Sequence, residues 1–457
     1  MFGSRDKSSD EGAKRRSLAA EVRPHLHPLS DARDLDPLLA ALGDARYVLL
    51  GEASHGTSEY YTWRAELSKR LIREKGFSFI AVEGDWPDCY RVNRYAKSYA
   101  SAGASAREVL HAFERWPTWM WANEEIVELV EWLRRYNDQR RLTDDRKAGF
   151  YGLDVYSLWD SMRAVVDYLE RIDPQLAAGA KRAYRCFEPY GEDEQEYARA
   201  TYLVPTSCED EAVSVLRTLR GRAPEYAQDG REAYFNAEQN AFVAKNAELY
   251  YRTMVRGGSA SWNVRDYHMV DTLDRLMSHH QQFNPGAKAI VWEHNTHIGD
   301  ARFTNMAGAG MVNVGQLVRQ AHGGDGVVLV GFGSHHGTVI AGEEWGAPMR
   351  RMRVPDARDG SFEDVMHEAV TAADETAALL VFDDAADGGI AGLDEPLPHR
   401  AIGVVYDPDH ERWGNYVPTV VPGRYDAFIY IDETRALNPL HLPVKVGEVP
   451  ETFPSGE

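Results

Sequence analysis

The sequence has few cysteines, and they do not form a known cysteine motif. Only three of the 457 residues are cysteines, namely Cys89, Cys186 and Cys208, and no two of them have Cys-x-x-Cys spacing. An odd count without that spacing indicates neither a disulfide framework nor a zinc site with thiolate ligands. We therefore expect a protein of a reducing compartment.

The chain also lacks excess positive charge and long apolar segments. Its 51 Lys and Arg residues stand against 71 Asp and Glu, giving a formal net charge of -20. Proteins that bind nucleic acid need a cationic surface, so we expect no nucleic-acid partner. No stretch approaches the roughly 20 apolar residues of a membrane span, so we expect no membrane partner. Residues 1–22 are polar and lack the apolar core of a signal peptide, which predicts a disordered tail and a cytoplasmic protein.

Motifs for nucleotide cofactors and for a nucleophilic serine are missing as well. The glycine-rich turn at residues 323–326 is not followed by a P-loop lysine, and no Gly-x-Gly-x-x-Gly pattern occurs. No Gly-x-Ser-x-Gly elbow occurs either. We therefore expect no cofactor, and if the protein is a hydrolase, water is the expected nucleophile.

Short apolar runs that alternate with helical patterns predict an α/β fold. Residues 47–50 and 79–82 have the pattern of buried strands, and residues 60–75 between them have apolar side chains at helical spacing before Gly76 ends the helix. Such a βαβ unit predicts parallel strands joined by a right-handed crossover. Further strands are expected at residues 149–153, 288–292, 327–331, 378–382, 401–406 and 427–431.

The middle of the chain predicts helices and no strands. Between Asp154 and His280 several segments have apolar residues at helical spacing, and none has a strand pattern. We expect a central, mostly parallel sheet flanked by helices, with a large all-helical insertion. The expected parts are a disordered tail (1–22), the first half of the α/β core (23–154), the helical insertion (155–281), the second half of the core (282–440) and a C-terminal tail (441–457).

Polar side chains follow three of the predicted strands directly. The first strand breaks at Gly51 and leads into Glu52 and His55, the second ends at Glu83, and the strand before residue 293 runs into His294 and His297. Because the carboxyl ends of strands in an open α/β sheet border the ligand crevice, we expect these clusters to converge in one pocket.

The first two clusters have both a catalytic and a structural interpretation. His55 can act as a base when a neighbouring carboxylate, Glu52 or Glu83, fixes its tautomer. Alternatively, Glu52 caps the following helix and His55 lies in a surface turn. Glu83 ends an apolar strand, where a charge needs a partner, and Arg64 on the preceding helix is the candidate for a buried ion pair.

The third cluster leaves a metal site open. His294 and His297 are three residues apart, which places them on one face of a helical turn, and they can polarise a carbonyl or stabilise an oxyanion. With Glu52 and Glu83 they could also hold zinc or manganese. The structural alternative places one histidine in the core and the other in solvent. The His-Glu-x-x-His pattern is missing, so metal-free catalysis is our preferred interpretation.

Two further sites are weaker candidates. Ser334-His335-His336-Gly337 follows the strand at residues 327–331 and could border the same pocket. Asp85 precedes Trp86-Pro87, and because proline favours the first helical turn, we expect Asp85 to cap a helix.

Six segments, in this order along the chain, resemble the erythromycin esterase family. They are residues 51–60, 76–83 and 150–154, Arg265-Asp266 with Met269, residues 292–297, and the tail from 402–406 to 428–432. The resemblance implies an α/β hydrolytic fold and hydrolysis of an ester, which in the macrolide-inactivating members opens the lactone ring. The histidine that the family is taken to use as the base for water corresponds to His55.

The resemblance also places the other candidates around the cleft of the family. We predict four catalytic residues, Glu52, His55, Glu83 and His294, and three substrate-binding residues, Arg64, His297 and Glu59, with no metal. Glu293 replaces the small residue that is common in the family and would add negative charge beside the site. The expected partner is a small-molecule ester or lactone. A divalent-metal-dependent hydrolase with the same residues as ligands and a binding protein without turnover stay open.

Overall fold

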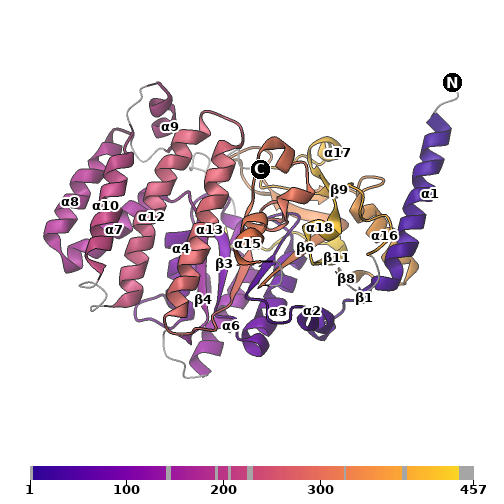
Figure 1. Cartoon of the computed structure of the whole chain (residues 1–457), viewed down its shortest axis with the longest axis horizontal. Coiled ribbons are helices and arrows are strands. Elements are labelled where there is room, and N and C mark those ends of the chain that lie inside the picture. The colour runs from indigo at the N-terminus through magenta and orange to yellow at the C-terminus, as the bar shows by residue number, and fades with distance from the viewer. Residues whose placement is uncertain are drawn as a thin grey trace.

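The fold is built around one large sheet in the middle of the molecule (Figure 1). A computed structural model describes residues 4–139, 146–190, 194–203, 207–223, 230–323, 326–382 and 389–441. The strands of the sheet are β1 His27–Pro28, β2 Tyr47–Leu50, β3 Phe79–Asp85, β4 Gly149–Asp154, β5 Ala289–Trp292, β6 Val327–Ala341, β7 Arg350–Val354, β8 Ala377–Val381 and β11 Ala427–Thr434.

The order of the strands places the predicted polar clusters side by side, at the carboxyl ends of the neighbouring strands β2, β5 and β3. The sheet runs β1-β8-β11-β6-β2-β5-β3-β4, with β7 paired to β6. Neighbours from β11 to β4 are parallel, whereas β1, β7 and β8 pair antiparallel. The predicted α/β class and mostly parallel sheet are confirmed. The strands β2 and β3 of the predicted βαβ unit are parallel, but β5 lies between them.

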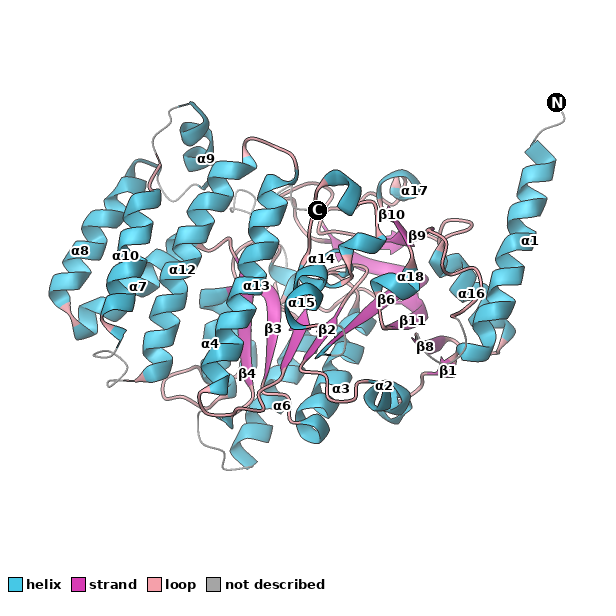
Figure 2. Cartoon of the chain, viewed as in Figure 1, coloured by secondary structure: helices cyan, strands magenta, loops and turns pink. Residues whose placement is uncertain are grey.

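Helices cover both faces of the sheet (Figure 2). Along β2, Val48 and Leu50 pack on the face that α3 and α6 cover, while Tyr47 and Leu49 pack on the face that α13 and α15 cover. This alternation follows from the two-residue period of a strand, and burial on both faces explains the continuous apolar runs. Outside the helical lobe and the N-terminal segment, the described helices are α2 Asp36–Ala41, α3 Ser58–Lys75, α4 Trp86–Ala96, α5 Ala106–His111, α6 Glu124–Gln139, α13 Ser259–Gln281, α14 Asn295–Ile298, α15 Val314–His322, α16 Phe362–Ala372, α17 Glu411–Gly414 and α18 Val421–Arg424.

A second core lies in a helical lobe at one end of the molecule (Figure 1). Between β4 and β5 the described residues form helices and no strand. The lobe has its own cluster of buried apolar side chains, and α13 joins the lobe to the sheet. Its helices are α7 Leu158–Ile172, α8 Pro174–Tyr184, α9 Glu194–Leu203, α10 Glu209–Gly221 and α12 Arg231–Met254.

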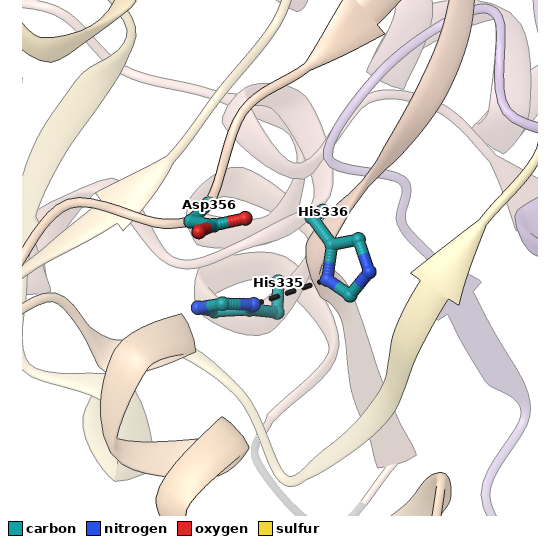
Figure 3. A group of neighbouring side chains, drawn as sticks. All are labelled: His335, His336 and Asp356. Carbon is teal, nitrogen blue, oxygen red and sulfur yellow. Dashed lines mark hydrogen bonds between the residues drawn. The ribbon is translucent and has the colours of Figure 1, made fainter.

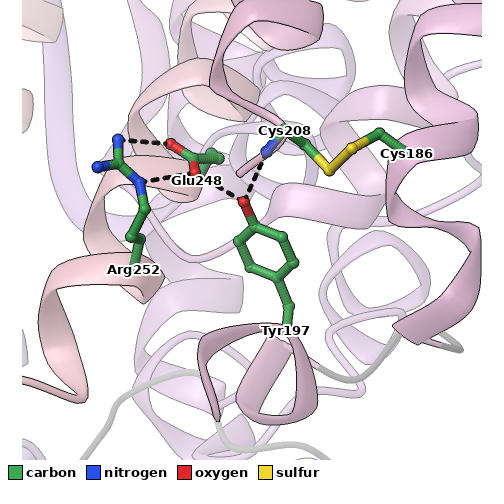
Figure 4. The surroundings of a disulfide bond; sticks show 5 residues. All are labelled: Cys186, Tyr197, Cys208, Glu248 and Arg252. Atoms are coloured by element: carbon green, nitrogen blue, oxygen red, sulfur yellow. Dashed lines mark hydrogen bonds and ion pairs between the residues drawn. A yellow bond between two sulfur atoms is a disulfide. The ribbon is translucent and has the colours of Figure 1, made fainter. Parts of the chain in front are cut away.

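The lobe contains a disulfide, which contradicts our expectation from the cysteine count. Cys186 and Cys208 are bonded, and Cys89 is the free, buried thiol. Beside the disulfide, the Tyr197 hydroxyl accepts a hydrogen bond from the Cys208 amide and donates one to Glu248 (Figure 4). Spacing along the chain did not reveal this pair, because the fold brings together residues 22 positions apart. The disulfide also removes an argument for a reducing compartment, where such bonds are rare.

The N-terminal segment differs from the predicted disordered tail. The helix α1 covers Ser4–Val22, and Leu18, Ala19 and Val22 are buried with side chains of α16 (Figure 1). These three apolar residues lie on one face of α1 and fix its C-terminal end on the core. The predicted C-terminal tail lies outside the described residues, apart from His441.

The last predicted strands are partly displaced. Residues 401–406 form isolated bridges to Ser54 and Gly342 instead of a strand. A two-stranded sheet of β9 Leu397–Arg400 and β10 Tyr416–Thr419 flanks these residues in the chain and was not predicted.

In the described residues, no helix has the length and apolar character that a membrane crossing requires.

We predict that reducing the disulfide lowers the free energy of unfolding by about 3 kcal/mol, because the cross-link restricts the unfolded chain. Denaturant titration followed by circular dichroism, with and without dithiothreitol, measures the change. The double variant Cys186→Ala/Cys208→Ala is the control and should not respond to the reductant. Equal stability of the wild-type protein in both conditions, or three titratable thiols in the unfolded, unreduced protein, would contradict the assignment.

Candidate active site

The carboxyl ends of β2, β3, β4 and β5 carry the polar residues of the site. Close packing at the end of β2 requires glycine, because a Cβ on Gly51 would overlap the Asn295 side chain. Asn295 in turn bonds the backbone of Phe332 on β6 through both of its amide atoms, at 2.7 and 3.3 Å. Its backbone N–H donates to the Glu52 carbonyl at 2.8 Å. These contacts fix the loop after β2 against the loop after β5.

His55 is held by a buried carboxylate. Its Nδ1 lies 3.0 Å from Oε1 of Glu52, and Oε2 of the same carboxylate accepts a hydrogen bond from Arg64 at 2.7 Å. The Arg64 guanidinium lies over the rings of Tyr61 and Trp292, 4.4 and 4.6 Å from their centres. Because Nδ1 of His55 donates to Glu52, Nε2 carries the lone pair of the neutral ring.

A second network surrounds Arg265 on α13. Its guanidinium donates to Glu83 at 2.7 Å and to both oxygens of Asp154 at 3.0 and 2.7 Å. A further N–H donates to Nε2 of His297 at 2.9 Å, and Nδ1 of His297 lies 3.0 Å from Asp266.

His294 connects the two networks. Its backbone N–H donates to Oε2 of Glu83 at 2.8 Å, and its ring lies beside that of His55 with 4.9 Å between the centres. Its Nδ1 accepts from the Thr296 amide at 3.3 Å and lies 2.8 Å from the Thr296 hydroxyl. The proton of the neutral ring is therefore on Nε2, which is buried and has no hydrogen-bond partner among the described residues.

The two neighbouring histidines have opposite pKa shifts. Burial by itself lowers the pKa of His55, but the negative charges of Glu83 and Glu52 outweigh burial and raise it above the ordinary value. Burial lowers the pKa of His294 well below its ordinary value, and the nearby His55 adds to this effect. A pair of groups with divergent pKa values is typical of an acid–base site.

The acids of the site differ from one another in the same way. Burial alone would raise the pKa of Glu83, but the adjacent His297 and the Arg265 guanidinium hold it below its ordinary value. Glu293 is buried without a hydrogen-bond partner in the described structure, and burial, with Glu83 and Asp266 nearby, raises its pKa well above the ordinary value. This shift favours the uncharged form of Glu293 and opposes the negative charge that we expected there.

Several predicted residues have other partners than expected. Arg64 pairs with Glu52 instead of Glu83, whose partner is Arg265. Arg64 is fully buried, and both ring nitrogens of His297 contact protein groups. Glu59 accepts from the backbone and side chain of Arg435, at 2.7 and 2.9 Å, and anchors the segment after β11.

No role was predicted for three residues of the Arg265 network, namely Asp154, Arg265 and Asp266. All three lie in segments that resemble the erythromycin esterase family. The available signal was an arginine next to an acid, Arg265-Asp266, inside one of these segments. Asp85 occupies the N-cap position of α4, as expected, but its side chain accepts from Arg115 at 2.9 Å and makes no capping hydrogen bond.

The donor set fits a metal poorly at this site. Arg265 already neutralises Glu83 and Asp154 and occupies Nε2 of His297, so these groups do not offer free lone pairs around a common centre. In the described part of the chain, the groups with metal-ligand spacing lie elsewhere and include none of these residues. The arrangement instead offers a lone pair on His55 beside an N–H on His294.

Comparison with known proteins agrees with this architecture. The profile of the erythromycin esterase family matches residues 72–434. An erythromycin esterase type II from Escherichia coli is 23% identical over 74% of this chain and 81% of its own. A putative hydrolase, YbfO, from Bacillus subtilis (strain 168) is 20% identical over 61% of this chain and 62% of its own.

Solved structures share the fold. A Bacillus cereus protein superposes with a TM-score of 0.77 at 19% identity, over 93% of this chain and 99% of its own. An erythromycin esterase mutant in its open conformation superposes with a TM-score of 0.61 at 16% identity, over 89% of this chain and 95% of its own. The family profile covers most of the chain, and the chain therefore belongs to the erythromycin esterase family.

Proposed function

We propose that this protein is a hydrolase that cleaves an ester or lactone of a small molecule with water activated by His55. The observation that carries the proposal is the contact between His55 and the buried Glu52, which leaves Nε2 of His55 as a base beside the Nε2–H of His294. The family and its hydrolase relatives support the same reaction class.

The reaction follows from the two tautomers. Nε2 of His55 takes a proton from water, and the resulting hydroxide attacks the carbonyl carbon. The Nε2–H of His294 donates to the oxyanion, a contribution of about 3–4 kcal/mol for one donor. When the tetrahedral intermediate collapses, the bond from carbon to the alkoxy oxygen breaks, and protonated His55 returns its proton to the leaving alkoxide.

The remaining buried residues position this pair. Glu52 fixes the tautomer of His55, and Arg64 holds Glu52. Glu83 holds the backbone of His294 and raises the pKa of His55 by its charge. Arg64 and His297 support the site from within the protein instead of contacting substrate.

A macrolide is the first substrate class to test, because an E. coli relative bears the name erythromycin esterase. We predict that incubation with a panel of macrolides and simpler lactones yields a product with one added water, detected by mass spectrometry. His55→Asn should lose about 100- to 10,000-fold in turnover while keeping its fold, the range for loss of a general base.

The matched control for this experiment is His410→Asn. His410 also bonds, through Nδ1, a carboxylate three residues away, Asp407 at 2.6 Å, but this pair is exposed. Tight binding of a lactone without product would favour a binding protein. A correctly folded His55→Asn variant with wild-type turnover would remove His55 from its role.

The pH profile tests the electrostatic part of the proposal. Only neutral imidazole accepts a proton, so kcat/KM should rise with pH, and the inflection should lie above the ordinary histidine pKa of about 6.5 because the pKa of His55 is raised. Glu52→Gln removes one of the charges responsible, so its inflection should move to lower pH. Glu74→Gln, an exposed acid of α3 paired with Arg70, is the control. An unchanged inflection in Glu52→Gln would contradict the assignment.

Chelation separates this mechanism from metal-dependent hydrolysis. Metal-bound water can titrate near pH 7 as well, so the pH profile does not distinguish the two mechanisms. We predict that prolonged EDTA treatment followed by gel filtration leaves kcat unchanged. Loss of activity that zinc, manganese or cobalt restores would reassign His55, Glu83, His294 and His297 as candidate ligands.

A further inference from the structure

A second group of histidines lies on β6, outside the site around His55. His335 and His336 are consecutive residues of β6. The strand β7 pairs with β6, and Asp356 lies just after the end of β7 (Figure 3). One ligand atom from each of the three side chains lies within 4.8 Å of the other two. His335 is buried, His336 is partly buried and Asp356 is exposed, so the group opens to solvent on one side.

The two imidazoles are already spaced like ligands of one ion. Their Nδ1 atoms are 3.1 Å apart, and the ring planes are nearly perpendicular at 88°. In a tetrahedral zinc site with Zn–N distances of about 2.0–2.1 Å, two ligating nitrogens are about 3.3 Å apart. Without an ion, one Nδ1 must be protonated to donate to the other. When a metal binds, that proton can move to Nε2 of the same ring.

Neighbouring contacts hold these two segments in place. The buried Arg400 guanidinium donates to the His335 carbonyl at 2.8 Å and to the Pro355 carbonyl at 2.9 Å, which ties β6 to the residue before Asp356. Such a brace fixes the relative position of the two ligand-bearing segments before an ion arrives.

The ring of His335 also has an outer support. It stacks on His367 with 3.8 Å between the ring centres, and His367 bonds Asp432 at 2.7 Å through Nδ1. His335, His367 and Asp432 also have ligand-like spacing. However, two stacked, parallel rings do not direct both lone pairs at one ion, and Asp432 already accepts from Tyr430. We therefore assign His367 and Asp432 to the outer support, which typically orients ligating histidines.

The protonation state of His335 suits a ligand. Burial, followed by the neighbouring His367, lowers its pKa to about 4. The ring is therefore neutral near pH 7, the form that coordinates a metal.

We propose that His335, His336 and Asp356 form a site for a divalent first-row transition metal ion, bound through the two Nδ1 atoms and the carboxylate with solvent in the remaining position. Two imidazoles and a carboxylate suit zinc, nickel or copper better than magnesium or calcium, which take oxygen ligands. The bound ion would join β6 to the segment after β7. This site does not depend on the proposed hydrolase function, since it shares no residue with the group around His55.

Zinc titration of the full chain tests the proposal. After EDTA treatment and gel filtration, isothermal titration calorimetry should show one equivalent of zinc bound, and zinc should raise the melting temperature. Cobalt at the same site should give the visible absorption bands of a nitrogen- and oxygen-ligated ion. Absence of stoichiometric zinc binding would overturn the proposal.

Variants locate the site. His336→Gln and Asp356→Asn alter side chains that are not fully buried, and each should weaken zinc binding by at least about tenfold, because even outer partners are worth about 10- to 100-fold. Each should also abolish the thermal shift. His335→Ala should have the same effect if it folds. His410→Asn, with its exposed His410–Asp407 pair, is the control and should bind zinc like the wild type. Unchanged affinity in His336→Gln and Asp356→Asn would place the bound zinc elsewhere and refute the site.

Discussion

The guanidinium of Arg265 holds the candidate active site together. It comes from α13, and it donates to carboxylates at the ends of β3 and β4 and to a histidine after β5. Without this cation, Glu83 and Asp154 would be two buried like charges, and removing one partner of a buried ion pair typically costs about 3–5 kcal/mol. The same contact fixes α13, and with it the helical lobe, on the edge of the sheet where the reaction is proposed to occur.

The arginine also makes the opposite states of the two central histidines possible. By keeping Glu83 ionised, it maintains the negative charge that raises the pKa of His55. Glu83 also accepts from the backbone of His294, so one carboxylate orients the proposed donor and tunes the proposed base. Burial raises the pKa of the neighbouring Glu293, which favours its uncharged form beside His294. A change of charge at one of these acids should therefore affect both histidines.

Histidines cluster in two places, after β2 and on the neighbouring strand β6, and their surroundings differ. Around His55 the imidazoles are surrounded by carboxylates and an arginine, and we propose that they serve proton transfer. On β6 the imidazoles of His335 and His336 face each other, with a carboxylate open to solvent nearby. Which neighbours surround an imidazole thus decides whether its lone pair acts as a base or as a ligand.

The amino-acid sequence alone determined the α/β class, the positions of β2, β3 and β4, and the location of Glu52, Glu83 and His294 at the carboxyl ends of strands. These features depend on local periodicity and on breaks such as Gly51, which neighbouring residues specify. The partners of the charged residues were decided only by the tertiary structure. Arg64 and Arg265 were both available to Glu83, and the crossing of α13 over the sheet, 182 residues along the chain from Glu83, selected Arg265. The disulfide between Cys186 and Cys208 and the raised pKa of Glu293 also come from the tertiary structure. A contact between distant segments and the loss of water around a side chain exist only once the chain is packed.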